Sequence, residues 1–198
     1  MTKIFLILLF VLMCPVSSFA AEEPVASPEN TDGVYIVQKY YDSGKLLSET
    51  EYKGEVPQGT AKTYYESGQL KIETPIEGGL PEGVEKVYYT NGKIWMERPY
   101  TQGKINGMVK TYYENGQLKS ERNYKRGEPD DANVHQKEYY PNGNLKMEAT
   151  SQYVKDSLHG VAKTYHENGK LKSETVIKDS ALISQEAYDQ RGNLITEE

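Results

Sequence analysis

The sequence predicts an all-β fold: an elongated single-layer antiparallel β-meander of about 14 strands, built from about seven β-hairpin repeats. Three observations support this prediction. Close variants of the phrase YYENGQLKSE recur along the chain, and each copy carries a glycine, at intervals of 23 to 27 residues. Two short segments with strand-like composition flank each of these glycines. A repeat of this length is typical of architectures in which each unit packs mainly on its neighbours.

The N-terminus has the features of a secretory signal peptide, predicted to span residues 1–20. Lys3 precedes a run of apolar residues, and the small residues Ser18 and Ala20 stand three and one positions before the expected cut. The alternative is a lipoprotein signal ending at Cys14, the only cysteine, but Met13 is large where a small residue is expected. We therefore expect export to the periplasm or secretion.

The rest of the chain divides into a short leader and the repeats. Residues 21–33 show no apolar periodicity and are expected to form a flexible leader, and residues 34–198 are expected to form the repeat domain. The chain has 17 tyrosines, whereas its three phenylalanines all lie within residues 1–20. A tyrosine ring is apolar in its body and polar at its tip, which favours a thin sheet with both faces near water.

Charge and hydropathy argue against two classes of partner. The formal net charge is −6, and −7 once Lys3 is removed. An acidic chain gains nothing from releasing counterions of nucleic acid and is repelled by anionic lipid. After residue 20 no apolar stretch approaches the length needed to span a bilayer, so no integral membrane segment is expected there.

The loop of each hairpin can be narrowed to two types. A two-residue type I′ turn would need positive φ at the residue before the glycine, where Ser67 and Arg191 are unfavourable. A three-residue loop, a type I turn followed by a left-handed glycine, accommodates every copy, including Pro141 in repeat five. We favour the three-residue loop, which places Tyr112 opposite Leu118. The type I′ turn stays as the alternative.

Two tyrosine columns follow from this register. The first tyrosine never varies and is expected, with the leucine opposite, to form the more buried face. The second becomes His166 in repeat six and Asp189 in repeat seven, and so is expected on the wetter face. The first column consists of Tyr40, Tyr64, Tyr88, Tyr112, Tyr139, Tyr165 and Tyr188.

The repeat unit G-x-x-K-x-Y-Y-x-N-G-x-L-K-x-E resembles the bacterial variant of the MORN repeat, over roughly residues 34–198. The resemblance implies an elongated antiparallel meander in which each repeat adds one hairpin. Bacterial proteins of this type often carry an antitoxin label, and eukaryotic MORN arrays usually associate with membranes or proteins. The chain departs from the pattern in the longer linkers around repeat five and in the lost second tyrosine of repeat seven.

The sequence offers only weak candidates for catalytic or metal-binding residues. A glutamate stands five residues after each turn glycine, as Glu97 and Glu121 do. In either register most of these glutamates lie near a lysine, which is on the same strand (Lys119) in one register and on the opposite strand (Lys110) in the other. Such a column is typical of a charge ladder on a solvated face, and its equivalent positions do not provide the unlike pair that acid–base catalysis needs. His159 is expected in a turn between repeats, and the histidines lack metal-ligand spacing. We therefore expect no enzyme activity, no catalytic or metal site and no cofactor.

Trp95 is the most informative single residue. It takes the place that Lys71, Lys119, Lys146 and Lys172 hold in other repeats, on a face predicted to be otherwise charged. With Tyr65, Tyr89 and Tyr113 it would form an aromatic strip in the middle of the array. Exposed aromatics can anchor a partner protein or stack on a sugar ring. The alternative is that Trp95 merely covers a neighbouring tyrosine.

These observations favour an exported, non-enzymatic repeat scaffold that binds a partner protein through its sheet face. The alternative is an antitoxin or immunity-type protein that neutralises a toxin acting in the cell envelope. A protein partner is favoured, and a glycan is the alternative ligand.

Overall fold

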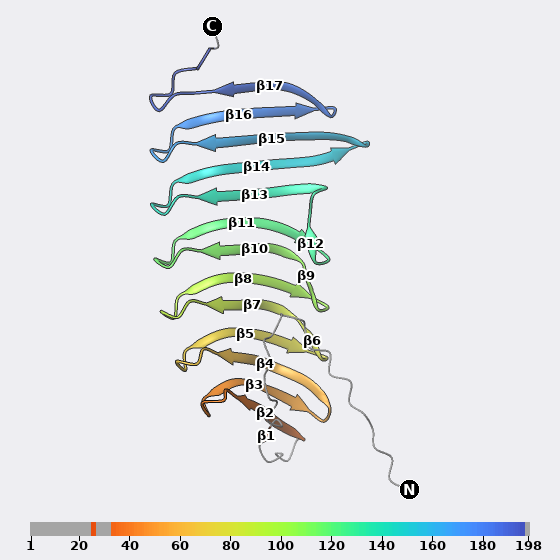
Figure 1. Ribbon diagram of the computed structural model, residues 1–198. Helices are drawn as coiled ribbons and strands as arrows, with labels where there is room; N and C mark the ends of the chain where they lie inside the picture. Colours follow the sequence, from red (N-terminus) through yellow and green to blue (C-terminus); the bar gives the residue numbers. More distant parts are fainter. Residues whose placement is uncertain (1–24, 27–32, 197–198) are drawn as a thin grey trace.

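Each repeat folds as one β-hairpin, and the hairpins lie side by side in a single sheet (Figure 1). A computed structural model describes residues 25–26 and 33–196. The predicted signal peptide and most of the predicted leader lie outside these described residues.

Thirteen of the described strands have six or more residues. They are β2 (Val34–Tyr40), β3 (Leu46–Lys53), β4 (Val56–Tyr64), β5 (Leu70–Glu77), β7 (Gly83–Tyr88), β8 (Ile94–Thr101), β10 (Gly107–Tyr112), β11 (Leu118–Lys125), β13 (Asn133–Tyr139), β14 (Leu145–Val154), β15 (Ser157–Tyr165), β16 (Leu171–Lys178) and β17 (Ala181–Ala187). Four short strands of two residues each complete the sheet: β1 (Val25–Ala26), β6 (Leu80–Pro81), β9 (Lys104–Ile105) and β12 (Glu128–Pro129).

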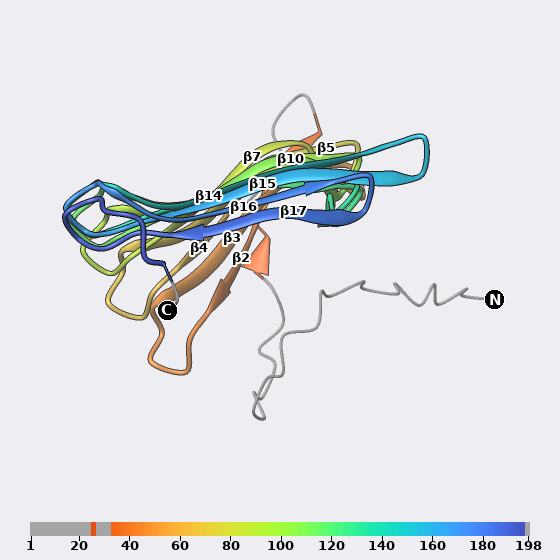
Figure 2. The same cartoon turned by 90° about the horizontal axis from the view of Figure 1, so that it is seen from above.

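Consecutive long strands pair antiparallel along the chain, so the predicted all-β meander is confirmed. The glycine loops line one side of the array and the connections between repeats line the other (Figure 1). Viewed along the array, successive strands are rotated relative to one another, the ordinary twist of a β-sheet (Figure 2). Where a fourteenth long strand was expected, after Gly192, the described chain forms only the bridge between Tyr188 and Leu194.

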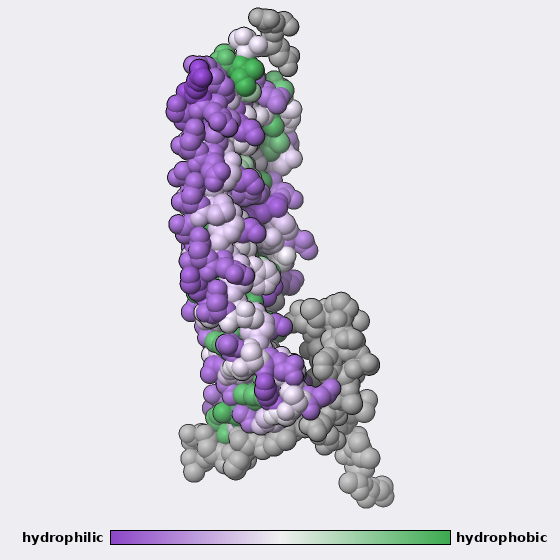
Figure 3. Space-filling model, turned by 60° about the vertical axis from the view of Figure 1, so that its left-hand side comes forward, coloured by the Kyte–Doolittle hydropathy of each residue, from purple (hydrophilic) through white to green (hydrophobic). Residues whose placement is uncertain are grey.

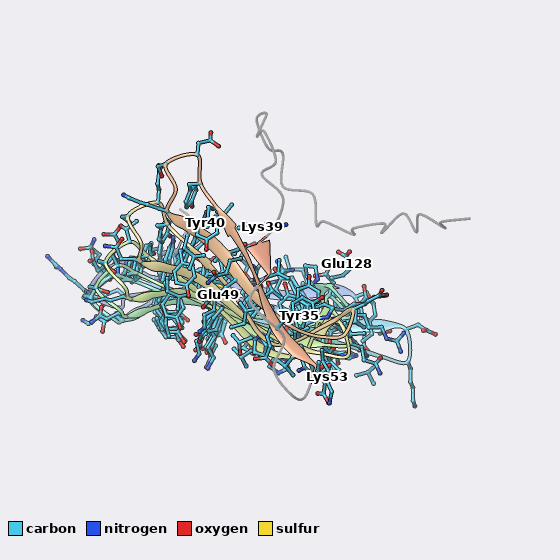
Figure 4. All side chains as sticks on the ribbon, turned by 90° about the horizontal axis from the view of Figure 1, so that it is seen from below. Tyr35, Lys39, Tyr40, Glu49, Lys53 and Glu128 are labelled. Atoms are coloured by element: carbon cyan, nitrogen blue, oxygen red, sulfur yellow. The ribbon has the colours of Figure 1, made fainter. Side chains whose placement is uncertain are left out.

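The sheet is one layer thick. Among the described residues only Val87 and Glu85 are buried, at 5% and 8% exposure, and most other strand residues are half-buried. Side chains project from both sides of the ribbon (Figure 4). Because no other layer of the described chain covers either face, the hairpins must be held together by contacts between neighbouring repeats, and the tyrosine-rich composition fits two wet faces.

The hairpin loop is the three-residue type. The Gly116 N–H donates to the Tyr113 carbonyl at 2.8 Å, and the Tyr113 N–H donates to the Gln117 carbonyl at 2.9 Å. Gly116 has φ of 93°, whereas Asn115 is not among the residues with positive φ. The type I′ alternative is therefore wrong, and the predicted pairing of Tyr112 with Leu118 is confirmed.

The loop geometry gives a stability prediction. A Cβ at Gly116 would meet only Lys93 Cδ, at 3.8 Å, so the cost of a substitution there comes from the backbone conformation and not from crowding. We expect Gly116→Ala to lower the free energy of unfolding by about 1 kcal/mol and Gly116→Val by more. The comparison is Asn115→Ser, because Ser43 and Ser67 occupy the same place in repeats one and two. Urea unfolding measures all three, and equal losses for Gly116→Val and Asn115→Ser would contradict the assigned turn.

Candidate interaction surface

One face of the sheet carries a ladder of lysine, glutamate and tyrosine. Lys110 lies opposite Glu121 within its own hairpin and opposite Glu97 of the preceding hairpin. Tyr112 lies two residues after Lys110 on the same strand, and its hydroxyl donates to Glu97 Oε2 at 2.6 Å. The same hydroxyl-to-glutamate bond links Tyr64 to Glu49, Tyr139 to Glu121 and Tyr165 to Glu148. Lysine–glutamate ion pairs of 3.1–3.9 Å recur along this face.

The ladder shows which lysines pair with the glutamates. Their cations are the opposite lysines, such as Lys62 and Lys86, and not the lysines two residues earlier on the same strand. The expectation that the first tyrosines form a buried face apart from the charges is wrong. They share the face of the glutamates and are half-buried, except that Tyr40 in the first repeat is 38% exposed, because the sheet has no second layer to cover them.

Four tyrosines of this face have raised pKa values. Burial, with the hydrogen bond to a glutamate adding to it, raises the pKa of Tyr64, Tyr88, Tyr112 and Tyr165 to about 12. The hydrogen bond from Tyr64 is also the main reason that the pKa of Glu49 is lowered. The bond between Tyr64 and Glu49 therefore favours the protonated tyrosine and the charged glutamate.

The second tyrosine makes a different link between repeats. Its hydroxyl donates to the backbone carbonyl of the first tyrosine in the next repeat, as from Tyr65 to Tyr88 at 2.6 Å and from Tyr113 to Tyr139 at 2.8 Å. The equivalent bonds run from Tyr41 to Tyr64, from Tyr89 to Tyr112 and from Tyr140 to Tyr165.

This link explains the variation that suggested a wetter face. His166 Nε2 lies 3.0 Å from the Tyr188 carbonyl, so histidine can replace the phenol as a donor. A carboxylate cannot donate. Asp189 instead accepts from the backbone N–H groups of Arg191 and Asn193 in its own loop, and the bond from Asn193 is the main cause of its lowered pKa. The side chain at this position thus bonds to the carbonyl of the next repeat in repeats one to six, whereas Asp189 of repeat seven stabilises its own loop.

Trp95 lies against one of these second tyrosines. The rings of Trp95 and Tyr89 are 6.3 Å apart and tilted by 50°. In the neighbouring repeats a lysine takes the place of the indole, with Lys71 Nζ 5.4 Å from the Tyr65 ring centre and Lys119 Nζ 5.6 Å from that of Tyr113. The structure therefore joins Trp95 to Tyr89, while Tyr65 and Tyr113 hold equivalent places beside their own lysines. Leu47 and Ile195 are further apolar residues at this repeat position.

A β-bulge decides which way Trp95 points. The pairing passes from Tyr88–Ile94 to Val87–Met96, so Trp95 is the extra residue of its strand. In a bulge two successive side chains leave the sheet on the same side. The ring contact of Trp95 with Tyr89, which lies on the face opposite to Tyr88, shows that the two are Trp95 and Met96. Both therefore lie on the face opposite to Glu97, and the expectation that Trp95 shares the glutamate face is wrong. The Trp95 side chain is 41% exposed.

A shallow cavity of about 360 Å³ lies beside Met96 on the same face. Arg98 Nε donates to Glu85 Oε1 at 2.7 Å, and the Thr74 hydroxyl bonds the same carboxylate. Arg122 forms an ion pair of 2.9 Å with Asp131. The cavity is lined by residues of β8, β9, β10, β11 and β13, among them Met96, Arg98, Val109, Arg122, Tyr124 and Glu138.

The sequence contained a signal for this cavity that we missed. Arg98 and Arg122 both stand six residues after the turn glycine, in repeats three and four. The corresponding residues elsewhere are threonine, alanine or, in repeat seven, Glu198; Thr74 and Ala149 are examples of the first two. The two arginines thus mark the middle of the array in the same way as Trp95 does.

The described residues show little that points to metal binding. They contain no group of three or more side chains that could hold a metal ion. His159 lies within β15, not in a turn as expected, and its Nε2 is 3.4 Å from Asp179 Oδ1. Within the same part of the chain no helix is long and apolar enough to cross a membrane.

A single open sheet of stacked hairpins, joined by recurring side-chain bonds, defines the class of β-hairpin repeat scaffolds. The MORN repeat variant matches the chain six times, and together the matches cover more than half of it. The chain therefore belongs to the MORN repeat variant family, a non-enzymatic type of repeat. The matches fall at residues 36–53, 57–77, 81–102, 105–126, 133–153 and 158–179.

Comparisons with whole proteins add little to the family assignment. No curated protein matches the sequence significantly. The chain is similar to part of the crystal structure of TcdB2-TccC3-TEV, with 11% identity and a TM-score of 0.26. The match covers 80% of this chain but only 12% of that one.

The second-tyrosine link gives a mutational prediction. Removing the Tyr113 hydroxyl takes the donor from the Tyr139 carbonyl, so we expect Tyr113→Phe to lower the free energy of unfolding by about 1 kcal/mol. The matched control is Tyr153→Phe, because Tyr153 is 56% exposed at a hairpin tip. Thermal unfolding followed by circular dichroism measures both, and equal stability of the two variants would show that the link contributes nothing.

The raised pKa values predict loss of stability in alkali. Unfolded tyrosines ionise near pH 10, while Tyr64, Tyr88, Tyr112 and Tyr165 in the folded chain keep their protons to about 12. Their contribution is therefore complete below pH 10 and is lost as the pH rises through 12. We expect the urea midpoint to fall as the pH rises from 10 to 12.

Lysine deprotonation in the same range would also weaken the ladder. Tyr112→Phe separates the two effects, because it removes one titrating tyrosine and no lysine. The fall in the urea midpoint should be smaller in this variant than in the wild type. An identical fall would assign the alkaline instability to the lysines alone.

Proposed function

We propose that this protein is an exported, non-enzymatic scaffold that binds a partner protein at Trp95, in the middle of the repeat array. The observation that carries the proposal is an indole that is 41% exposed at a position where four other repeats have lysine. The surface is defined by Trp95, Tyr89 and Met96 and by the adjoining cavity, and we call it the Trp95 surface.

The Trp95 surface combines an apolar centre with a polar rim. Trp95 and Met96 leave the sheet on the same side, and Val109 and Tyr124 continue the apolar lining into the cavity. Arg98 and Arg122 lie at its border, each paired with a carboxylate. Aromatic anchors surrounded by polar side chains are typical of the energetic centres of protein interfaces.

A protein partner fits this arrangement better than a glycan. A sugar stacks on an open, flat aromatic face, whereas Tyr89 is tilted by 50° against the indole and does not extend it into a platform. The side chains of a protein can enter a shallow cavity while the backbone follows the sheet.

The test is Trp95→Lys, which installs the residue found in four other repeats and should leave the fold intact. Removing a hot-spot aromatic typically costs about 2 kcal/mol or more, roughly 30-fold in affinity. We expect the variant to lose a partner that the wild type captures from a cell-envelope extract. The matched control is Leu47→Lys, which introduces lysine at the same repeat position in repeat one. This variant should keep that partner.

Circular dichroism of both variants checks that they fold. A folded Trp95→Lys protein that captures every wild-type partner would overturn the Trp95 surface. If the captured protein is a toxin that this chain inactivates, the scaffold is the envelope antitoxin considered as the alternative.

Export is part of the proposal and rests on residues 1–20, which lie outside the described structure. We expect the protein expressed from its full sequence to be recovered outside the cytoplasm with Ala21 as its first residue, as measured by N-terminal sequencing. Recovery of the full-length chain in the cytoplasm would overturn export without affecting the Trp95 surface. A lipidated product beginning at Cys14 would assign the alternative signal.

A further inference from the structure

The last long strand, β17, has one paired side and one largely open side. Its inner side pairs with β16 from Ser173–Ala187 to Lys178–Ala181. On its outer side the described chain returns only briefly, through the Tyr188–Leu194 bridge and a bond of 2.8 Å from the Ile195 N–H to the Ala187 carbonyl. Between residues 181 and 186 no described strand lies on this outer side.

The backbone groups that face outward can be assigned from these bonds. The Tyr188 N–H points inward to the Lys172 carbonyl, whereas the Ala187 carbonyl points outward to Ile195. Because backbone groups alternate in direction along a strand, Gln185 also presents its N–H and C=O outward. Ile183 is the extra residue at a register shift.

This open edge has little of the usual side-chain protection. Natural edges are blunted by lysine, proline or charge, but residues 181–185 carry no charge and no proline. Leu182 and Ile183 are 60% and 59% exposed, and Leu194 and Ile195 are 52% and 56% exposed. Apolar residues gather at the C-terminal end of the array in the space-filling view (Figure 3). The bulge at Ile183 and the charge of Glu186 are the features that protect this edge in the described chain.

The opposite edge of the same sheet shows how such an edge is filled. There β1, an extended segment of two residues, pairs antiparallel with β2 through Val25–Gln38 and Ala26–Val37. An extended segment can therefore pair with the edge of this sheet, and the outer side of β17 presents unpaired backbone groups of the same kind.

Charge at β17 indicates what kind of segment would fit. Glu186 stands at the repeat position where five of the other six first strands have lysine, such as Lys163 in repeat six. It lies directly opposite Glu174, whose ion pair of 3.1 Å is with Lys163 on the far side. A strand added outside β17 would place its own side chain opposite Glu186, where a cation is favoured.

We propose that the outer edge of β17 binds an extended peptide segment of a partner protein, antiparallel to β17. The segment carries lysine or arginine opposite Glu186 and apolar side chains beside Leu182 and Ile183. It completes the seventh hairpin in place of the strand that the described chain does not form. This edge is separate from the Trp95 surface and does not depend on it.

The probe is a fluorescent, end-blocked peptide with the sequence of residues 173–178, SETVIK, in which Glu174→Lys is introduced. β16 is the inner neighbour of β17, and a strand on the outer side runs in the same direction, so a copy of β16 has the right geometry. We expect the lysine peptide to bind, and to bind on the order of fivefold more tightly than the unchanged glutamate peptide. Fluorescence anisotropy measures both.

Backbone pairing also predicts which amide groups of the peptide must donate hydrogen bonds to β17. In the expected register the amides of its residues 175 and 177 face β17, and that of residue 176 faces away. N-methylation at 175 or 177 should abolish binding, and N-methylation at 176 should leave it unchanged. Equal effects at the three positions would overturn the proposal, whatever the peptide's overall affinity.

On the protein side, Gln185→Pro removes the outward donor without removing a bond to β16, as proline allows on an edge strand. It should weaken peptide binding at least tenfold while thermal unfolding stays near the wild-type temperature. Trp95→Lys should bind the peptide as the wild type does. Failure of the lysine peptide to bind, or a dimer of this chain that Gln185→Pro dissociates, would overturn the proposal and leave the Trp95 surface untouched.

Discussion

The structure depends on hydrogen bonds that tyrosine side chains make from one repeat to the next. The second tyrosine donates to the backbone of the following repeat, as Tyr113 does to Tyr139, and the first donates to the glutamate of the preceding repeat, as Tyr112 does to Glu97. In a sheet of one layer, with only Val87 and Glu85 buried among the described residues, there is no deep core to hold the hairpins in place. Phenylalanine would supply the same apolar ring but neither bond, which is why the repeats use tyrosine throughout.

These bonds also determine where the sequence is free to vary. Histidine can replace the second tyrosine at His166 because it can still donate, whereas the position of Trp95 carries lysine, leucine, isoleucine or tryptophan in different repeats. That position is the extra residue of a bulge, so its side chain takes no part in the ladder of the opposite face. A recognition residue can therefore be placed there without disturbing the contacts between repeats.

An open array has two kinds of surface available for binding, and they differ in chemistry. The face offers side chains held in register, and its irregular residues lie in the middle, at Trp95 and the neighbouring cavity. The edge offers backbone groups. At the first edge β1 already pairs with β2, and at the last edge β17 is open over residues 181–186 in the described chain. A scaffold of this kind can thus hold one partner by side-chain contacts and another by strand addition, with neither site requiring the other.

The sequence by itself determined the repeat, the all-β meander, the three-residue loop and the pairing of Tyr112 with Leu118. All of these follow from local constraints, because a left-handed glycine at Gly116 sets the loop and the loop sets the register of its own hairpin. Only the tertiary structure decided which face Trp95 occupies, which lysines meet the glutamates, and that the second tyrosine bonds to the next repeat. Each of these depends on how one hairpin lies against another and on a bulge that breaks the simple alternation of faces. Strand periodicity describes one strand at a time and contains no information about either.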